Sequence, residues 1–208
     1  MMCKNFPAGT NFHFIQVGAN DGVSFDILYD IVKERRSKGI VIEPLPDFYK
    51  KLCINYKFFP HIVKVNIAAH PTLSTVTMYR VDPVTDCSLA SWTSGIASLD
   101  PMHHKKSGTE SKYIIEERVK ALPLMQIIAE AKTGVDVDLL QIDVEGFDYE
   151  ILNMIDFNRM KPSAIKYEYS NLSAIDFEKS KELLTNNGYH LFPIGDDMIA
   201  ILLRKIRL

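Results

Sequence analysis

Residues 12–22 read FHFIQVGANDG, an apolar run that ends at two glycines enclosing polar residues. The run is short and rich in β-branched and aromatic side chains, which is typical of a buried strand. After the glycines, the apolar pairs Ile27–Leu28 and Ile31–Val32 repeat at the spacing of one helix face. The stretch therefore predicts a strand, a tight turn over residues 18–22 and a helix, which together begin a βαβ unit.

The same alternation of strand and helix patterns continues along the chain. Further parallel strands are predicted at residues 39–42, 62–67, 138–142 and 164–169. The last two apolar runs, 189–194 and 198–204, are separated by a short turn around Gly195, which predicts an antiparallel hairpin. The chain is therefore predicted to be an α/β protein with a doubly wound, mostly parallel sheet that ends in an antiparallel C-terminal hairpin.

Residues 75–81 (TVTMYRV) alternate between polar and apolar side chains, which predicts a half-exposed strand added antiparallel at an edge of the sheet. Residues 82–112 show no clear period and are too long for a plain connector, so they predict a lid or a substrate loop. A short helix is predicted between Pro123 and Gly134. Because no linker, repeat or low-complexity tract divides the chain, we expect a single domain over residues 1–208.

The composition is that of an ordinary globular protein, with 24 Lys+Arg, 26 Asp+Glu and 47% hydrophobic residues. The charges form no basic block, so nucleic acid is not an expected partner. The longest apolar run, Met198 to Leu203, is too short to span a membrane, and we find no secretion signal pattern at the N-terminus. Three scattered cysteines indicate neither a disulfide framework nor a zinc site, so we expect a cytoplasmic protein. The oligomeric state stays open.

The turn after the first strand is a candidate cradle for a small molecule. Gly18 allows a close approach, and Asn20 and Asp21 supply polar groups before the next helix. The turn lacks the three glycines of a dinucleotide fingerprint, and the Asp21 carboxylate would repel a pyrophosphate. A ligand with a cationic or amino-acid part therefore fits better. The alternative is a plain turn in which Asp21 or Ser24 caps the helix.

Glu43 ends the second strand and lies 22 residues after Asp21. In doubly wound sheets an acidic residue at this place accepts hydrogen bonds from ribose hydroxyls, although a surface carboxylate before the Pro44 turn is the alternative. Residues 66–69, at the end of the third strand, would then flank the adenine of a bound nucleoside. The alternative is that they serve only in the packing of the strand.

Four motifs in this order, IQVGANDG, VIEPLP, VNIAAH and LLQIDVEGFDYEIL, resemble the FkbM family of S-adenosylmethionine-dependent methyltransferases. The resemblance implies the class I methyltransferase (Rossmann-like) fold, whose seven-stranded sheet has its last strand antiparallel. It also implies that Gly18 and its neighbours hold the methionine part of S-adenosylmethionine, Glu43 the ribose, and Ala68 and its neighbours the adenine. The full set of candidate cofactor-binding residues is Val17, Gly18, Ala19, Asn20, Asp21, Glu43, Pro44, Asn66, Ala68 and Asp143.

Asp143 and Glu145 follow the strand at 138–142, on the crevice side of the predicted sheet. Methyl transfer to oxygen requires orientation and removal of a hydroxyl proton. We therefore take Glu145 as the candidate proton acceptor or anchor of the acceptor hydroxyl, and Asp143 as a group on the cofactor side, with helix capping as the alternative for both. His103 is a second candidate base if the long loop closes over the site; otherwise it and His104 would be solvated.

Members of this family typically methylate hydroxyl groups, often on sugars or polyketide products. We therefore expect O-methylation of a sugar, a glycan or another small molecule. A nicotinamide-dependent oxidoreductase and a non-catalytic binding module are the alternatives. Trp92 could stack on an acceptor. A magnesium site formed by Asp143, Glu168 and Asn171 is a weaker alternative, because the resemblance requires no metal.

Overall fold

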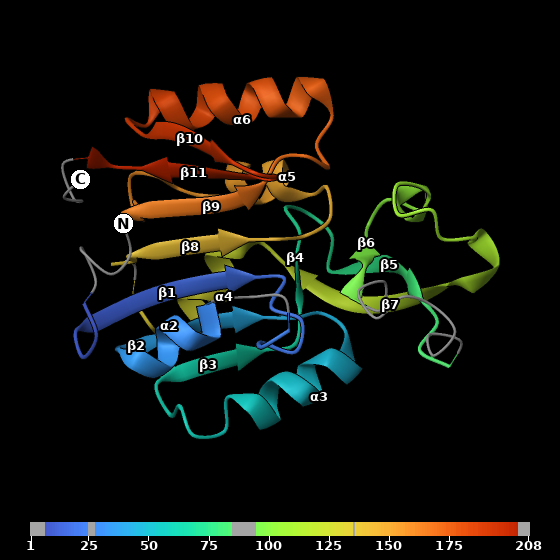
Figure 1. The fold of residues 1–208 in the computed structure, drawn as a ribbon, viewed down its shortest axis with the longest axis horizontal. Coiled ribbons are helices and arrows are strands. Elements are labelled where there is room, and N and C mark those ends of the chain that lie inside the picture. The colour runs from blue at the N-terminus through green and yellow to red at the C-terminus, as the bar shows by residue number, and fades with distance from the viewer. Residues whose placement is uncertain (1–6, 25–27, 85–94, 135, 204–208) are drawn as a thin grey trace.

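The computed structural model describes residues 7–24, 28–84, 95–134 and 136–203 (Figure 1). Its large sheet has seven strands in the order β10-β11-β9-β8-β1-β2-β3. The strands are β1 (Asn11–Val17), β2 (Arg36–Ile42), β3 (Ile62–Val65), β8 (Leu139–Ile142), β9 (Ala164–Glu168), β10 (His190–Ile194) and β11 (Asp197–Ile201). β1 pairs in parallel with β2 and β8, whereas β11 is antiparallel to both β9 and β10. The predicted parallel sheet with an antiparallel C-terminal hairpin is confirmed.

Helices cover both faces of the large sheet. They are α2 (Leu28–Glu34), α3 (Pro46–Asn55), α4 (Leu124–Ala131), α5 (Asp148–Asn153) and α6 (Ala174–Asn186). Alternate side chains of β1 point to opposite faces: Phe12 and Phe14 pack in a cluster with residues of α2 and α3, and Ile15 and Val17 in a cluster with residues of α4, α5 and α6. The result is the doubly wound arrangement. None of the helices among the described residues is long and apolar enough to cross a bilayer.

A second, small sheet lies beyond the carboxyl ends of β1 and β8 (Figure 1). Its strands, in the order β4-β7-β5-β6, are β4 (Ala68–Ala69), β7 (Ile114–Leu122), β5 (Thr75–Val81) and β6 (Ala97–Ser98). The prediction that residues 75–81 join an edge of the large sheet is therefore wrong, although their pairing is antiparallel. The physical reason is that the apolar sides of β5 and β7 pack against Leu45 and Phe48, at the start of α3, in a core cluster of their own.

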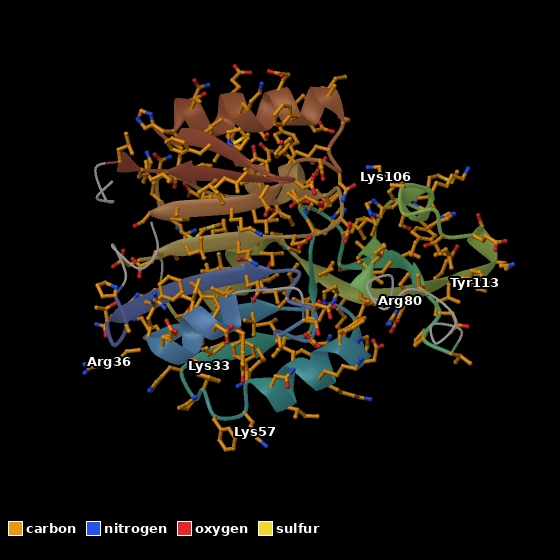
Figure 2. All side chains as sticks on the ribbon, in the orientation of Figure 1. Lys33, Arg36, Lys57, Arg80, Lys106 and Tyr113 are labelled. Atoms are coloured by element: carbon orange, nitrogen blue, oxygen red, sulfur yellow. The ribbon has the colours of Figure 1, made fainter. Side chains whose placement is uncertain are left out.

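Arg80 of β5 joins the small sheet to α3. Its guanidinium, which is 3% exposed, contacts the Asp47 carboxylate at 2.6 and 2.8 Å and Glu117 of β7 at 3.1 Å. It also lies over the Phe48 ring, 5.2 Å from the ring centre. Figure 2 labels Arg80 within this part of the molecule. The ion pair therefore fixes the start of α3, which directly follows the Glu43 segment, to the small sheet.

Removing Asp47 is expected to destabilise the fold more than removing Arg80. In Asp47→Ala the buried guanidinium keeps only Glu117, and leaving a buried charge short of a partner costs about 3 kcal/mol. In Arg80→Met the remaining carboxylates of Asp47 and Glu117 are 40% and 31% exposed and can be solvated, so the expected cost is about 1 kcal/mol. Urea denaturation of the two variants measures the difference, and equal losses would contradict this asymmetry.

Candidate active site

A cavity of about 580 Å³, here called the main cavity, lies where the carboxyl ends of β1, β2, β8 and β9 face residues 95–107. Its volume falls within the roughly 300–1,000 Å³ of typical small-molecule sites. Predicted site residues among its lining are Gly18, Ala19, Asn20, Glu43, Pro44, His103, Asp143 and Glu145. The sheet thus brings together side chains that are far apart in the sequence.

The turn after β1 requires glycine at its first position. Gly18 has a φ of +79°, and a Cβ atom there would lie 1.8 Å from the backbone oxygen of Asp143. The backbone N–H groups of Gly18 and Ala19 donate to the Ile42 carbonyl, which ties the turn to the end of β2. Asn20 follows in the left-handed region, with a φ of +50°. The turn therefore brings the backbone of the β1 and β8 ends into close contact at the cavity wall.

Asp21 caps this turn. Its Oδ1 accepts hydrogen bonds from the backbone N–H groups of Val23 and Ser24, at 2.9 and 2.7 Å, and its Oδ2 accepts the Ser24 hydroxyl at 2.7 Å. Partial burial raises the pKa of Asp21, but these hydrogen bonds outweigh it and the net pKa is lowered. The side chain is absent from the lining of the main cavity. The capping alternative therefore describes the geometry of Asp21.

Glu43 lies at the base of the main cavity and is 5% exposed. Its Oε2 accepts the N–H of Asn20 and its Oε1 that of Leu45, both at 2.8 Å. Burial raises the pKa of Glu43 to about 7 despite these hydrogen bonds. Each carboxylate oxygen can accept more than one hydrogen bond. The side chain is thus held by the backbone and can still bind hydroxyl groups from the cavity.

The residues predicted around an adenine are divided between two roles. The Asn66 side chain donates to the backbone oxygens of Glu43 and Pro44, both at 2.9 Å, and braces that segment instead of lining the main cavity. Val17, Pro44 and Ala68 line a small apolar cavity of about 40 Å³, which shares Gly18, Pro44, Met78 and Val144 with the main cavity. That volume is roughly the size of one water molecule, so a base would have to widen it.

Glu145 and His103 form a close pair on the wall of the main cavity. His103 Nε2 lies 2.8 Å from Glu145 Oε2, and the same oxygen accepts the Asn171 side-chain amide at 3.1 Å. Glu145 has a φ of +54°, a conformation that is strained for a non-glycine residue. His103 and His104 are only 4% and 7% exposed. The alternative of two solvated histidines is therefore wrong.

Part of the predicted loop at 82–112 forms one wall of the cavity. It contains β6 and two short 3-10 turns, η3 (His103–Lys105) and η4 (Ser111–Tyr113). The Ser98 hydroxyl donates to the backbone oxygen of Glu145 at 2.7 Å, and Lys106 Nζ donates to that of Asn171 at 2.7 Å. Figure 2 labels Lys106 on the side of this region that faces β9. These two contacts place the loop against the ends of β8 and β9. Trp92 lies outside the described residues.

Asp143 lines the main cavity. Partial removal of its carboxylate from water raises the pKa of Asp143 to about 7, and the negative charges of Glu145 and Glu168 contribute to this rise. Asn171 points its amide N–H groups, not its oxygen, at Glu145 and Glu168. Across the described ranges, no group of three or more His, Cys, Asp or Glu side chains is placed to hold a metal ion. In this geometry the Asn171 side chain offers no oxygen ligand to a magnesium ion between Asp143 and Glu168.

Sequence reasoning missed two buried glutamines in the cavity lining. Gln16 and Gln141 stand opposite one another in the paired strands β1 and β8 and are 2% and 5% exposed. A polar residue inside an otherwise apolar strand was the available signal. Lys166 and Asp196 also line the cavity, but nothing in their local sequence distinguishes them.

Comparisons with known proteins identify the family and the fold of the chain. A sequence profile described as the methyltransferase FkbM domain matches residues 16–191. The solved structure of methyltransferase FkbM from Methylobacillus flagellatus KT shares the fold, with a TM-score of 0.56 and 14% identity; the alignment covers 92% of this chain and 44% of that one. A search of curated proteins found no match.

Two further solved structures resemble the chain more weakly. One is precorrin-6y C5,15-methyltransferase from Geobacter metallireducens GS-15, with a TM-score of 0.47 and 11% identity over 96% of this chain and 83% of that one. The other is fibrillarin from Aeropyrum pernix with natively bound S-adenosyl-L-methionine, with a TM-score of 0.48 and 10% identity over 94% and 69%. Because the FkbM profile covers most of the sequence and the fold is that of class I methyltransferases, the chain belongs to the FkbM family of S-adenosylmethionine-dependent methyltransferases.

Proposed function

We propose that this protein transfers the methyl group of S-adenosylmethionine to a hydroxyl group of a sugar, a glycan or a natural-product small molecule. The observation that carries the proposal is the Glu145–His103 pair, which lies on the wall of the cavity that also contains Gly18 and Glu43. A carboxylate beside an imidazole is an arrangement suited to removing a hydroxyl proton.

The residues of the main cavity fit the cofactor. Gly18 exposes its backbone in the cavity lining, and Glu43 offers a buried carboxylate for hydroxyl groups. Asp143, Glu145 and Glu168 give the cavity an acidic wall that favours a positively charged sulfonium. In this proposal Gly18, Ala19 and Asn20 hold the methionine part, Glu43 holds the ribose, and Asp143 lies on the cofactor side.

When bound, S-adenosylmethionine supplies a methyl group already activated by its positive sulfur. In the proposed reaction, Glu145 would take the proton that the acceptor hydroxyl loses when it is methylated. Oε2 of Glu145 is engaged by His103 and Asn171, so Oε1 is the atom that accepts this proton. Because an ionised carboxylate only accepts hydrogen bonds, His103 Nε2 is the donor in its contact with Glu145. His103 thus holds Glu145 in place.

The acceptor has a separate place to bind. A side cavity of about 250 Å³ shares Glu145, His103, Lys106 and Asn171 with the main cavity, and its remaining lining includes Asp100. The shared wall would set the acceptor oxygen beside Glu145. Carboxylates outnumber lysines across the main cavity, and Lys166 is paired with Asp197 at 2.9 Å. This charge balance supports a neutral hydroxyl compound over a phosphorylated one.

Incubation with S-adenosylmethionine carrying a labelled methyl group tests the proposal against a panel of acceptors. The panel contains monosaccharides, glycolipids and natural-product alcohols, together with RNA, peptides and amines as other classes. We expect label in a methyl ether of one hydroxyl compound, and inhibition of its formation by added S-adenosylhomocysteine. Transfer to RNA, peptide or amine with none to any hydroxyl compound would overturn the proposal.

A further inference from the structure

Asp148 is a fully buried acid that the proposed chemistry does not use. It is the first residue of α5, lies two positions after Gly146 and is 0% exposed. It is thus placed beneath the loop that carries Asp143 and Glu145, next to the end of β9. An acid without any contact with water requires a structural or functional explanation.

The Asp148 carboxyl group connects the two strand ends that carry the acids of the cavity. Its Oδ1 accepts the backbone N–H of Glu168, the last residue of β9, at 3.2 Å. The backbone N–H of Gly146, directly after Glu145, also lies near the same carboxyl group and acts to lower its pKa. One side chain therefore sets the separation between the Glu145 loop and the end of β9, beside which Asn171 bridges Glu145 and Glu168.

The surroundings of Asp148 favour its uncharged form. Its Oδ2 has no hydrogen-bond partner, and within the described residues no cation lies at ion-pair distance from the side chain. The titratable groups that face it are Asp143 in the loop after β8, Glu168 of β9, and the hydroxyl of Tyr167, which is bonded to Ser180 of α6. Burial, followed by the two acids, raises the pKa of Asp148 well above its ordinary value, and the backbone N–H groups of Glu168 and Gly146 only partly oppose this. An unpaired buried hydroxyl costs far less than an unpaired buried charge.

We propose that Asp148 is a positioning residue that holds the Glu145 loop against the end of β9 as a neutral carboxylic acid. The effect on turnover rests on the proposed role of Glu145, but the position and the proton can be measured without any acceptor. Asp148→Asn keeps the Oδ1 acceptor and cannot ionise, whereas Asp148→Ala removes the acceptor. Asp156→Asn is the matched control, because Asp156 accepts a single backbone hydrogen bond at the surface.

The imidazole resonances of His103 report the position of Glu145, because Nε2 is bonded to that carboxylate. They are identified by their disappearance in His103→Asn. We expect Asp148→Ala to shift them, and Asp148→Asn and Asp156→Asn to leave them unchanged. If Glu145 proves dispensable for turnover, this measurement still decides whether Asp148 positions it, so the two proposals fail separately.

The proton on Asp148 is tested by the pH dependence of unfolding. The native protein keeps this proton at pH values where the unfolded chain, with an ordinary aspartate pKa of 3.8, has lost it. The native state then binds one proton more, so stability falls as pH rises, by up to about tenfold in the folding equilibrium constant per pH unit. Asp148→Asn is expected to remove this component of the slope, and Asp156→Asn to retain it.

Either of two results would overturn the proposal. One is an Asp148→Asn protein with the wild-type slope, which would mean that Asp148 is ionised in the native state. The other is a shift of the His103 resonances in Asp148→Asn as large as that in Asp148→Ala. If Asp148→Ala does not fold, the slope and the resonances of Asp148→Asn decide the matter alone.

Discussion

Replacing Glu145 with glutamine is expected to lower the turnover of methyl transfer by about 10²–10⁴-fold, the usual contribution of a general base. Glutamine keeps the size of the side chain and can still meet His103 and Asn171, but it cannot take the hydroxyl proton. Affinity for S-adenosylhomocysteine should stay close to that of the wild type, because the cofactor is assigned to the Gly18 and Glu43 side of the cavity. Rate measurement with the acceptor identified by the panel, together with calorimetry, separates the two effects.

The matched control is Glu182→Gln, an exposed glutamate on α6 that is absent from the cavity lining. We expect wild-type turnover from it. The turnover of His103→Asn should lie between those of Glu145→Gln and Glu182→Gln, because His103 acts through Glu145. Wild-type turnover in Glu145→Gln would show that another group removes the proton, and the proposed mechanism would then be wrong.

The second large effect is expected at Gly18. An added Cβ would lie 1.8 Å from the Asp143 backbone oxygen, a contact with rigid backbone that no side-chain rotation can relieve. The φ of +79° adds about 1–2 kcal/mol of strain for any residue other than glycine. Together with overpacking of about 1–3 kcal/mol, Gly18→Ala should lose roughly 2–5 kcal/mol of stability and displace the Asp143–Glu145 loop.

Gly134→Ala provides the comparison, since its φ is +89° and a Cβ there meets nothing within 4 Å. It should lose only the backbone contribution, about 1 kcal/mol. Urea denaturation gives both losses. Similar losses in the two variants would mean that the close approach of the β1 and β8 ends does not constrain residue 18.

The sequence predicts the large sheet well because each of its strands has its own local signal. Short apolar runs rich in β-branched residues, and the glycine turns that end them, are readable within a few residues. The small sheet was missed because β7, with the sequence IIEERVKAL, carries four charged residues in nine. Its partner β5 ends more than thirty residues earlier, so no local pattern reveals the pairing.

Some residues of the site could likewise be predicted from local sequence, and others could not. Gly18 and Glu43 could be located from strand ends alone, because parallel strands deliver their carboxyl ends to one edge. The burial of His103 could not, since it depends on Glu145, 42 residues further along the chain. The Asp21 side chain illustrates an ambiguity of another kind: the same carboxylate suits a ligand or a cap, and only its hydrogen bonds to Val23 and Ser24 distinguish them.

The central claim is that the main cavity binds S-adenosylmethionine through Gly18 and Glu43, and calorimetric titration with S-adenosylhomocysteine tests it most directly. The account predicts a Kd on the order of micromolar for the wild type. For a folded Glu43→Ala variant, it predicts binding weaker by about 1.5–3 kcal/mol, the usual contribution of hydrogen bonds to a charged group. Absence of binding to the wild type, or undiminished binding to Glu43→Ala, would contradict it.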